Sequence, residues 1–305
     1  MASATVLSAS GGVYDVLLED GTVAEASLRG RLKLQQRTGD RVVAGDRVHV
    51  ASQPDNSLTI ESVAPRASEL ARRAPGHGRR AKVIVANVDR VIIVLAAREP
   101  EPKRRLLDRF LVLAESSRLE SLIVLNKVDQ VDADTAAAFL HPYEAAGYAT
   151  LRTSVMEATN IDAFRRIVCS GRSVVTGPSG AGKSSLLNAV QPGLGLRIGD
   201  VSETVRKGQH TTVNARVIPL ECGGYVADTP GLRELGLWGI DPAELAGCFP
   251  ELADLIGTCR FGHSCSHTHE PDCAIRAAVD TGAVDRERYE SYVTLRDEVA
   301  STPQY

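Results

Sequence analysis

The sequence is poor in aromatic residues and in long apolar runs. Of its 305 residues only 4% are aromatic, with a single Trp, so the cores must be aliphatic. This scarcity argues against an aromatic platform that stacks single-stranded nucleic acid. The longest wholly apolar run is Val91–Ala97, whereas a membrane-spanning helix needs about 20 such residues. No Lys or Arg occurs among the first ten residues, so we expect no signal peptide and no membrane partner.

Charge of one sign is also not in excess. The chain has 35 Lys and Arg against 38 Asp and Glu, a net charge of −3, so no overall field draws it onto nucleic acid. Its 43% hydrophobic and 24% charged residues are ordinary for a soluble globular protein and exclude a disordered or fibrous chain. At about 100–200 residues per domain, the length predicts two or three domains.

Cysteine is too sparse for a disulfide scaffold, but three of the six cysteines cluster. Their spacing is Cys-x5-Cys-x-His-x5-Cys, and three thiolates with one imidazole make a closed tetrahedral zinc set. In a reducing cytosol such a cluster indicates a metal more than disulfides. His263 and His269 remain alternative ligands, and we expect Cys169, Cys222 and Cys248 to be buried packing residues. The predicted ligands of one structural Zn²⁺ are Cys259, Cys265, His267 and Cys273.

The first 82 residues divide into a β-rich part and a basic part. Residues 1–65 contain four or five short strands, typical of a small closed barrel of SH3 or oligonucleotide-binding (OB) type. An accessory barrel without a ligand is equally consistent with this pattern. Residues 66–82 have a local net charge of +5 and predict a flexible basic linker. Such a run is usually only a solvated segment, but it supplies candidate RNA contacts in Arg72, Arg73, Arg79, Arg80 and Lys82.

The remainder predicts an α/β domain at 83–239 and a helical domain at 240–305. Apolar strands alternate with helices such as Arg104–Ser117 and Ala133–Ala146, as in doubly wound parallel sheets. The expected strands are Val91–Ala97, Ser121–Leu125 and Ser173–Thr176. After Gly239 we expect a capped helix start at Asp241-Pro242, then helices at Arg276–Asp280 and Arg286–Ala300.

A glycine-rich segment fits the phosphate-binding loop pattern, with an expected strand before it and a helix after it. Glycines let backbone N–H groups approach phosphate oxygens, and the helix N-terminus favours negative charge. Lys183 can reach the β- and γ-phosphates, and the Ser184 hydroxyl can coordinate Mg²⁺. A glycine-rich turn of structural use only is the alternative. The predicted nucleotide-binding residues are Gly177, Pro178, Ser179, Gly180, Ala181, Gly182, Lys183, Ser184 and Ser185.

An Asn-Lys-Val-Asp string follows the apolar segment Leu122–Leu125. An Asp carboxylate can accept hydrogen bonds from N1 and N2 of guanine, a pair that adenine does not offer. In isolation the string is a common helix-capping loop, but beside a phosphate loop it selects GTP. Ser154, at the end of the next expected strand, is placed for a backbone contact to the guanine oxygen. The predicted base-binding residues are Asn126, Lys127, Asp129 and Ser154.

Two further segments complete the expected site. Asp228 comes 45 residues after Lys183, at the end of an apolar strand where it can hold Mg²⁺, and the amide of Gly231 can meet the γ-phosphate. Thr211 or Thr212, in the position of the first switch, is expected to complete the Mg²⁺ coordination.

The residue after Gly231 is Leu232, where Ras-type GTPases have a Gln that orients the attacking water. An aliphatic side chain cannot orient water. His210 is the nearest polar replacement, and with Lys183 it is our catalytic candidate; a solvent-facing loop histidine is the alternative reading.

The order of the motifs is unusual. Ras-type GTPases have the phosphate loop first and Asn-Lys-x-Asp last, whereas here Asn126 precedes Gly177. The central domain therefore resembles a circularly permuted GTPase, an arrangement tolerated when the original termini lie close together. The second switch then leads directly into the C-terminal segment.

Over nearly its full length the chain resembles the ribosome small-subunit-dependent GTPases of the RsgA/YjeQ family. The resemblance rests on Gly208–Thr212, Asp228–Leu232 and the His267-to-Cys273 half of the zinc pattern. It implies an N-terminal OB barrel, a permuted P-loop GTPase domain and a C-terminal α-helical zinc domain. It also implies slow GTP hydrolysis that the 30S subunit stimulates, with His210 serving in hydrolysis. Five residues rather than four separate the first two cysteines, which leaves His263 as a competing ligand.

These observations predict a monomeric, cytoplasmic GTP hydrolase that binds 16S rRNA and acts late in 30S maturation, with Mg²⁺ and one Zn²⁺. An alternative is a nucleotide-gated RNA-binding scaffold whose hydrolysis is incidental; the salt dependence of rRNA binding in GDP and in a non-hydrolysable GTP analogue distinguishes the two. A P-loop kinase conflicts with Asn126–Asp129.

Overall fold

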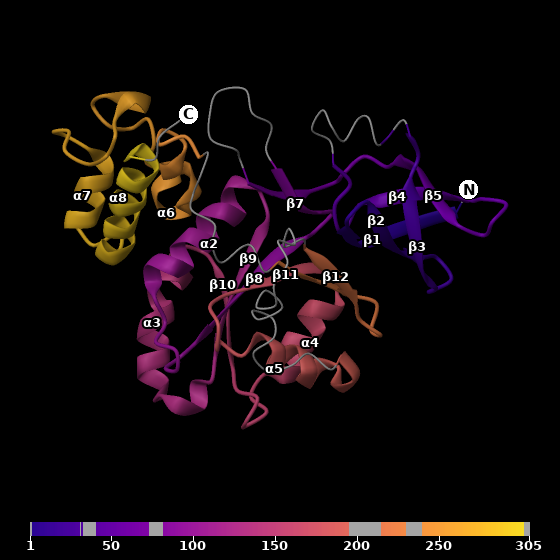
Figure 1. The fold of residues 1–305 in the computed structure, drawn as a ribbon. Coiled ribbons are helices and arrows are strands. Elements are labelled where there is room, and N and C mark those ends of the chain that lie inside the picture. Colours follow the sequence, from indigo (N-terminus) through magenta and orange to yellow (C-terminus); the bar gives the residue numbers. More distant parts are fainter. Residues whose placement is uncertain are drawn as a thin grey trace.

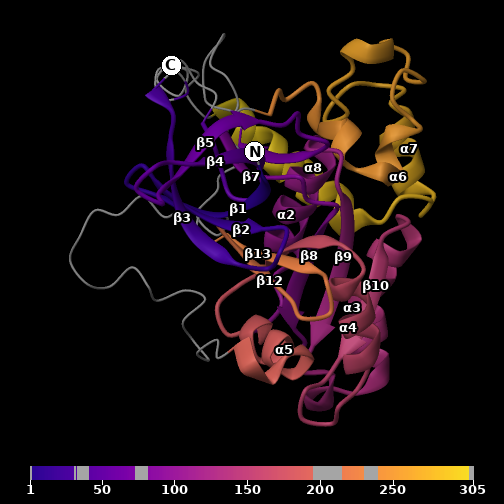
Figure 2. The same ribbon diagram turned by 90° about the vertical axis from the view of Figure 1, so that its right-hand side faces the viewer.

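The computed structural model describes residues 2–30, 32, 41–72, 82–194, 215–229 and 240–301. A barrel, a central α/β unit and a helical C-terminal unit follow one another along the chain (Figure 1). Figure 1 shows the barrel and the C-terminal helices on different sides of the central unit, and in Figure 2 the barrel side faces the viewer. Among the described residues, no helix combines the length and the apolar character needed to cross a membrane.

Five strands close the N-terminal barrel in the order β1-β2-β3-β5-β4, with β4 returning to β1. All pairs are antiparallel except β3 with β5. Alternate residues point inward, and Val6, Val16 and Ile60 are completely buried, so the predicted barrel with an aliphatic core is confirmed. The strands are β1 (Ala2–Ser10), β2 (Val13–Leu18), β3 (Val23–Leu28), β4 (Arg47–Ser52) and β5 (Leu58–Val63).

The segment after the barrel is partly extended. Strand β6 (Glu69–Arg72) pairs antiparallel with β7 (Lys82–Ala86), and Arg72 stands opposite Lys82 in the backbone register. The segment expected to be a flexible linker therefore contributes a strand at each end. Arg73, Arg79 and Arg80 lie outside the described residues.

The central sheet has the order β10-β9-β8-β11-β13-β12, parallel throughout except for β12. Val91, Ile93 and Leu95 of β8 pack with α2 and α3 on one face, whereas Ile92 and Val94 pack with α4 and α5 on the other. Both faces are covered, which confirms the doubly wound reading. The strands are β8 (Arg90–Ala96), β9 (Glu120–Asn126), β10 (Ala149–Thr153), β11 (Arg172–Thr176), β12 (Arg216–Pro219) and β13 (Tyr225–Asp228).

Four helices cover this sheet at its two faces (Figure 1). They are α2 (Arg104–Ser116), α3 (Ala133–Ala145), α4 (Ile161–Cys169) and α5 (Lys183–Val190). Asp132 caps α3 by accepting a hydrogen bond from Thr135 N at 2.7 Å, a local stabilisation that begins the helix after the Asn-Lys-Val-Asp string.

The C-terminal unit contains the short α6 (Pro250–Ala253), α7 (Ala274–Asp280) and the long α8 (Arg286–Ser301) around Phe249, Tyr292 and Leu295. The predicted helix start at Asp241 is wrong. Asp241 Oδ1 accepts a hydrogen bond from Ala243 N at 2.9 Å, but the chain makes only a turn there before a 3₁₀ helix at Leu245–Cys248. The Asp side chain stabilises a turn as well as a helix end, because both expose the same backbone N–H.

The three cysteines outside the predicted metal cluster are of two kinds. Cys248 is buried as a packing residue, as expected. Cys169 and Cys222 are instead joined in a disulfide, so the expectation that they are isolated packing residues is wrong. They lie 53 positions apart in sequence, and only the packing of α4 against the β12–β13 hairpin brings them together.

Candidate nucleotide site and metal centre

The predicted phosphate loop connects β11 with α5, as the sequence indicates. Gly177 has φ 135°, and a Cβ there would lie 2.0 Å from the Val94 carbonyl oxygen. Gly182 has φ 92°, and a Cβ there would lie 2.2 Å from Asn126 Nδ2. Both positions thus require glycine for the backbone conformation and for space. The loop lies at the carboxyl end of β11 with the N-terminus of α5 behind it, the arrangement that binds phosphate.

Lys183, the first residue of α5, lies inside this loop. Its side chain is buried, and Nζ donates to the carbonyl oxygens of Gly177 at 2.9 Å and Pro178 at 2.7 Å. Ser184 beside it is also buried. A lysine ammonium held at the centre of a loop of backbone N–H groups is placed to meet the negative charge of a β- or γ-phosphate.

The Asn-Lys-Val-Asp string lies at the end of β9 and is joined to the phosphate loop through Asn126. This residue is 2% exposed; its Nδ2 donates to the Ala181 carbonyl oxygen at 2.9 Å, and its Oδ1 accepts from Thr153 Oγ1 at 3.0 Å. Asn126 therefore fixes the distance between the base motif and the phosphate motif. The role of Thr153 as its second partner was not predicted from the sequence.

Asp129 lies in the 3₁₀ turn that follows, beside the loop after β10. Its Oδ1 accepts a hydrogen bond from Ser154 Oγ, and Glu157 N donates to that same hydroxyl at 3.1 Å. Lys127 has the left-handed φ of 61°, and its Nζ donates to the Glu99 carbonyl oxygen. The predicted base-binding residues are thus brought to one place, with Ser154 in contact with Asp129.

Asp228 ends β13 and pairs in register with Val175 of β11, so it lies directly beside the strand that enters the phosphate loop. The next residue, Thr229, is buried, and its hydroxyl has no hydrogen-bond partner among the described residues. The remaining predicted site residues, His210, Thr211, Thr212 and Gly231, lie outside the described residues. The structure therefore assembles the base and phosphate motifs and one side of the expected Mg²⁺ site.

The four predicted zinc ligands form one cluster in the C-terminal unit. Their candidate ligand atoms, on Cys259, Cys265, His267 and Cys273, all lie within 4.8 Å of one another, and all four residues are buried. Nδ1 of His267 is 3.5 Å from the Sγ atoms of both Cys259 and Cys273. Three thiols and one imidazole at these separations fit a tetrahedral zinc ion, which prefers sulfur and nitrogen ligands.

The two spare histidines point elsewhere. The His263 ring packs against Gly257, where a Cβ would lie 2.9 Å from His263 Cε1, and His269 Nδ1 is 2.9 Å from Thr268 Oγ1. Within the part of the chain that the structure describes, the metal cluster contains neither of them. Of the three candidate histidines, His267 is the one that the fold brings to the cysteines.

Glu270, which the sequence reading did not single out, organises the loop around His267. Its carboxylate accepts from the backbone N–H of Ser266 at 2.7 Å and of Thr268 and His269 at 3.2 Å each. Desolvation acts to raise the pKa of Glu270, but hydrogen bonds with Ser266 and neighbouring N–H groups hold that pKa well below its usual range. Metal-ligand loops need such outer contacts to orient the ligand.

Comparisons with known proteins agree with this geometry. The RsgA GTPase family model matches residues 63–238. The small ribosomal subunit biogenesis GTPase RsgA of Gemmatimonas aurantiaca is 48% identical over 296 residues, 96% of each chain. Its counterpart in Moorella thermoacetica is 43% identical over 295 residues, 97% of this chain and 96% of the relative.

Two crystal structures also match over the whole molecule. YjeQ from Thermotoga maritima has a TM-score of 0.79 at 33% identity and covers 99% of both chains. YloQ, described as a circularly permuted GTPase, has a TM-score of 0.74 at 29% identity, covering 100% of this chain and 97% of the other.

The strand order and the two joined motifs define a class: this is a P-loop GTPase whose base motif precedes its phosphate loop, a circular permutation. An OB-type barrel precedes the GTPase unit, and a cysteine and histidine cluster follows it. The chain belongs to the RsgA GTPase family.

Proposed function

We propose that the chain hydrolyses GTP to GDP and phosphate during late maturation of the 30S ribosomal subunit. The hydrogen bond from Asn126 Nδ2 to the Ala181 carbonyl oxygen supports the nucleotide assignment most directly, because it holds the base motif against the phosphate loop at 2.9 Å. The role in small-subunit maturation follows from the relatives, which are named small ribosomal subunit biogenesis GTPases.

The guanine base is recognised by the Asn126–Asp129 string and the loop after β10. The Asp129 carboxylate accepts from guanine N1 and N2, while Ser154 holds that carboxylate in place through its hydroxyl. The backbone N–H of Ser154 meets the guanine oxygen. The Lys127 side chain, fixed by its bond to the Glu99 carbonyl, covers the base side of the phosphate loop.

The phosphates are bound by the loop and by the N-terminus of α5. The backbone N–H groups of residues 179–185 face the phosphate oxygens, and Lys183 transfers its hydrogen bonds from the Gly177 and Pro178 carbonyls to the β- and γ-phosphates. Ser184, Asp228 and one of Thr211 and Thr212 would hold Mg²⁺, which supplies positive charge to the developing β–γ oxygens. Gly231 N–H donates to the γ-phosphate.

His210 is proposed to orient or deprotonate the attacking water, since Leu232 cannot. Small-subunit binding would complete this part of the site, which accounts for slow turnover of the free protein. The barrel, the basic segment 66–82 and the zinc unit are the proposed 16S rRNA contacts, with a structural Zn²⁺ on the Cys259 cluster. We place the protein in the cytoplasm as a monomer.

A change of base specificity tests the nucleotide assignment. Xanthine has a carbonyl where guanine has its N2 amine, so Asp129→Asn replaces an acceptor by a donor that xanthine can accept. We expect this variant to lose GDP affinity by about 10²-fold or more and to gain affinity for xanthosine diphosphate, because a site built for one hydrogen-bond pattern rejects the other. Equilibrium titration with fluorescent GDP and xanthosine diphosphate measures both.

Asp134→Asn is the matched control, since Asp134 is an exposed carboxylate in the first turn of α3. It removes the same charge a short distance away and should leave both affinities unchanged. Equal loss of GDP binding in the two variants, or no gain for the xanthine nucleotide in Asp129→Asn, contradicts the assignment.

A further inference from the structure

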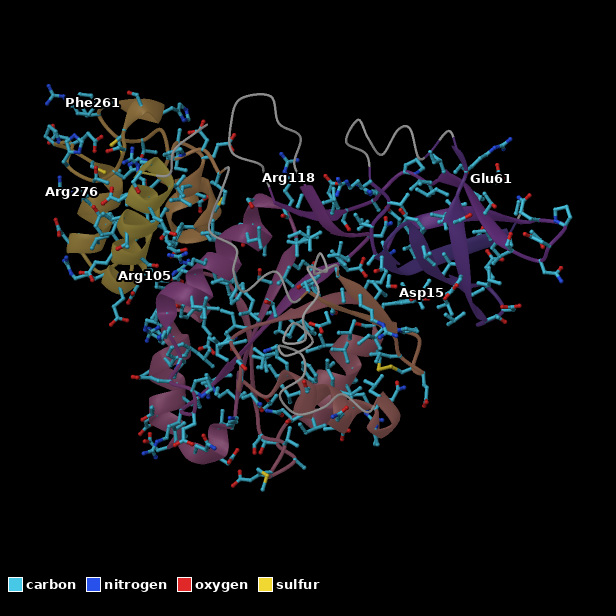
Figure 3. The ribbon with its side chains drawn as sticks, viewed as in Figure 1. Asp15, Glu61, Arg105, Arg118, Phe261 and Arg276 are labelled. Atoms are coloured by element: carbon cyan, nitrogen blue, oxygen red, sulfur yellow. A yellow bond between two sulfur atoms is a disulfide. The ribbon has the colours of Figure 1, made fainter. Side chains whose placement is uncertain are left out.

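The disulfide between Cys169 and Cys222 lies at the surface of the GTPase unit, and both residues precede the metal cluster in the sequence. Cys169 ends α4, and Cys222 lies in the exposed turn between β12 and β13. In Figure 3 it is the sulfur–sulfur bond beside α4 and β12. The nucleotide site uses neither residue.

The turn is packed closely against the end of α4. A Cβ at Gly224 would lie 2.0 Å from the Val168 carbonyl oxygen and 2.9 Å from Cys169 Cα, so only glycine fits there. Glu221 N donates to Gln191 Oε1 at 2.9 Å, and Gln191 is the residue that ends α5. The turn therefore touches both helices that flank the phosphate-loop strand.

The two strands that the turn connects lead to the site and to the barrel. β13 ends at Asp228, the proposed Mg²⁺ ligand, and β12 contacts β1 of the barrel. A cavity of about 260 Å³ adjoins the turn, with Gly223, Tyr225 and Val217 on one side and the barrel residues Thr5 and Arg47 on the other. Beside the disulfide there is thus room for the hairpin to move once the covalent bond is absent.

We propose that Cys169 and Cys222 form a reversible thiol–disulfide site that exchanges with small-molecule disulfides of the glutathione class and controls how firmly the β12–β13 hairpin is held to α4. Disulfides in reducing compartments are typically redox-sensing, and exposed ones are the readily exchanged ones. The cysteines of the metal cluster and Cys248 are buried, whereas Cys222 is exposed.

The exchange balances without any further reactant. The Cys222 thiol loses its proton, and the thiolate attacks one sulfur of the small disulfide, forming a mixed disulfide; the thiolate that is expelled takes up the proton and leaves as a thiol. The Cys169 thiolate then attacks the Cys222 sulfur and releases the second thiol. Two protein thiols are oxidised by two electrons, and one small disulfide is reduced to two thiols.

The oxidised form holds the start of β13 against the end of α4, and Asp228 is at the other end of this short strand. The bond therefore resists local opening of β13 and, with it, the release of bound nucleotide. We expect GDP to dissociate at least about threefold more slowly from the oxidised than from the reduced protein. We also expect the melting temperature of the GTPase unit to rise by roughly 10 °C on oxidation, from the entropy of closing a loop of this length. The expected effect on GDP dissociation rests on the proposed function, whereas the expected thiol–disulfide exchange does not.

The test equilibrates the full-length, zinc-loaded protein in glutathione buffers from fully oxidised to fully reduced, alkylates free thiols and counts them by mass spectrometry. We expect Cys169 and Cys222 to change together within this range. A disulfide that persists in the most reducing buffer, or thiols that persist in the most oxidising one, overturns the proposal. Zinc content is measured in parallel and should stay constant.

GDP release and melting are then compared in the two redox forms of the wild type, of Cys222→Ser and of the double variant C169S/C222S. Only the wild type should respond to the redox state; equal rates and melting temperatures in its two forms overturn the control of the hairpin. Cys222→Ser alters one exposed turn residue, so it provides a folded control if the double variant is unstable. Thiols that titrate in a protein that binds no GDP support the thiol site and contradict the proposed function instead.

Discussion

The central unit is attached to its two neighbours by different chemistry. The barrel is attached through the backbone: Ala86 N donates to the Ala44 carbonyl oxygen at 2.9 Å, and the buried Asn87 bridges Ala67 N and the Gly45 carbonyl oxygen, both at 2.9 Å. These groups are uncharged, and Leu7 of β1 joins the apolar core of the central unit. One ion pair lies beside them: Arg66 donates through Nε to the buried Asp46 at 2.7 Å. The hydrogen bonds of Asn87 themselves join neutral groups and should therefore respond little to pH.

The C-terminal unit is attached through a buried ion cluster. Arg288 of α8 donates through Nε to Glu251 Oε1 at 2.7 Å and through Nη1 to Asp108 of α2. Arg288 and Asp108 are 2% and 1% exposed, and the guanidinium also lies over the rings of Phe249 and Tyr143 at 4.7 and 5.1 Å. Because the guanidinium is planar and its N–H groups have fixed directions, it can donate to both carboxylates only when they are held in one relative orientation.

Because the two junctions are held by different interactions, we expect them to respond differently when a partner is lost. Backbone hydrogen bonds and apolar packing make the barrel a continuation of the sheet edge, whereas a buried charge cluster stabilises one orientation and becomes costly once a partner is lost. The C-terminal unit follows directly on the segment expected to form the second switch. We therefore expect changes in charge to affect the zinc unit's orientation more than the barrel's.

Removal of the arginine should have the largest effect. Arg288→Met leaves the buried Asp108 and the partly buried Glu251 uncompensated, and we expect it to lower the free energy of unfolding by about 3–5 kcal/mol at neutral pH. Urea unfolding followed by circular dichroism measures this. The loss should shrink as the pH falls, because burial already raises the pKa of Asp108 above its usual value and protonation removes the unpaired charge.

Arg286→Met is the control for this change. Arg286 is on the same helix but exposed, and its contact with Asp280 at 3.6 Å is at the surface. Such pairs contribute at most about 1 kcal/mol. A similar loss in the two variants would show that the buried cluster has no special part in the junction.

Removal of the Asn87 side-chain amide, at the junction with the barrel, should lower the free energy of unfolding by less. Asn87→Ala leaves Ala67 N–H and the Gly45 carbonyl without their partner, and we expect a loss of about 2 kcal/mol. This loss should be independent of pH between about 5 and 8, because Asn87 and its two backbone partners carry no charge in this range. Hydrogen exchange at residues 44–46 and 67 should also increase.

Gln53→Ala serves as the comparison variant for Asn87→Ala. Gln53 lies in the β4–β5 turn of the barrel, and its side-chain amide makes no hydrogen bond with any residue that the structure describes. It should unfold like the wild type. A pH-dependent loss for Asn87→Ala would contradict the view that the hydrogen bonds of Asn87 join neutral groups.

The smallest expected effect is a gain in stability at the C-terminal junction. Burial raises the pKa of Glu115, although the neighbouring Tyr148 hydroxyl and the charge of Arg288 oppose the increase. Its ionisation therefore costs stability above the folded-state pKa, and the cost disappears below the unfolded-state pKa. Because this side chain is only half buried, we expect Glu115→Gln to stabilise by about 0.5 kcal/mol at pH 7. The gain should vanish near pH 4, roughly the pKa of an unfolded glutamate.

Glu120→Gln, at an exposed carboxylate that begins β9, is the control for this measurement. It should show no gain at either pH. A Glu115→Gln variant that is less stable than wild type at pH 7 would mean that the attraction of Arg288 outweighs the burial of this carboxylate.

The sequence predicted those features that depend on local spacing. Gly177–Ser184 and Asn126–Asp129 are contiguous motifs, and the structure places them after β11 and β9, on either side of β8, because parallel strands direct their carboxyl ends to one edge. The zinc cluster spans only 15 residues, so the spacing was sufficient to name the four members that the fold brings together, although it left His263 and His269 as alternatives.

Contacts between distant residues could not be predicted in this way. Asp108 and Arg288 are 180 positions apart, and Cys169 and Cys222 are 53 apart. Each pair forms only after the helices have packed on the sheet, and neither residue of a pair has a local pattern that reveals its partner. Asn87 likewise follows a strand without any signal of the two backbone groups that it joins.

The most direct test of the account is the rate of GTP hydrolysis by the full-length protein, measured as phosphate release with and without purified 30S subunits. The account predicts very slow turnover alone and an increase of about 10²-fold or more with 30S subunits, the scale on which positioning a general base or water acts. The stimulation should be absent in His210→Ala, although that variant still binds GDP. Equal rates with and without 30S subunits would contradict the proposed function.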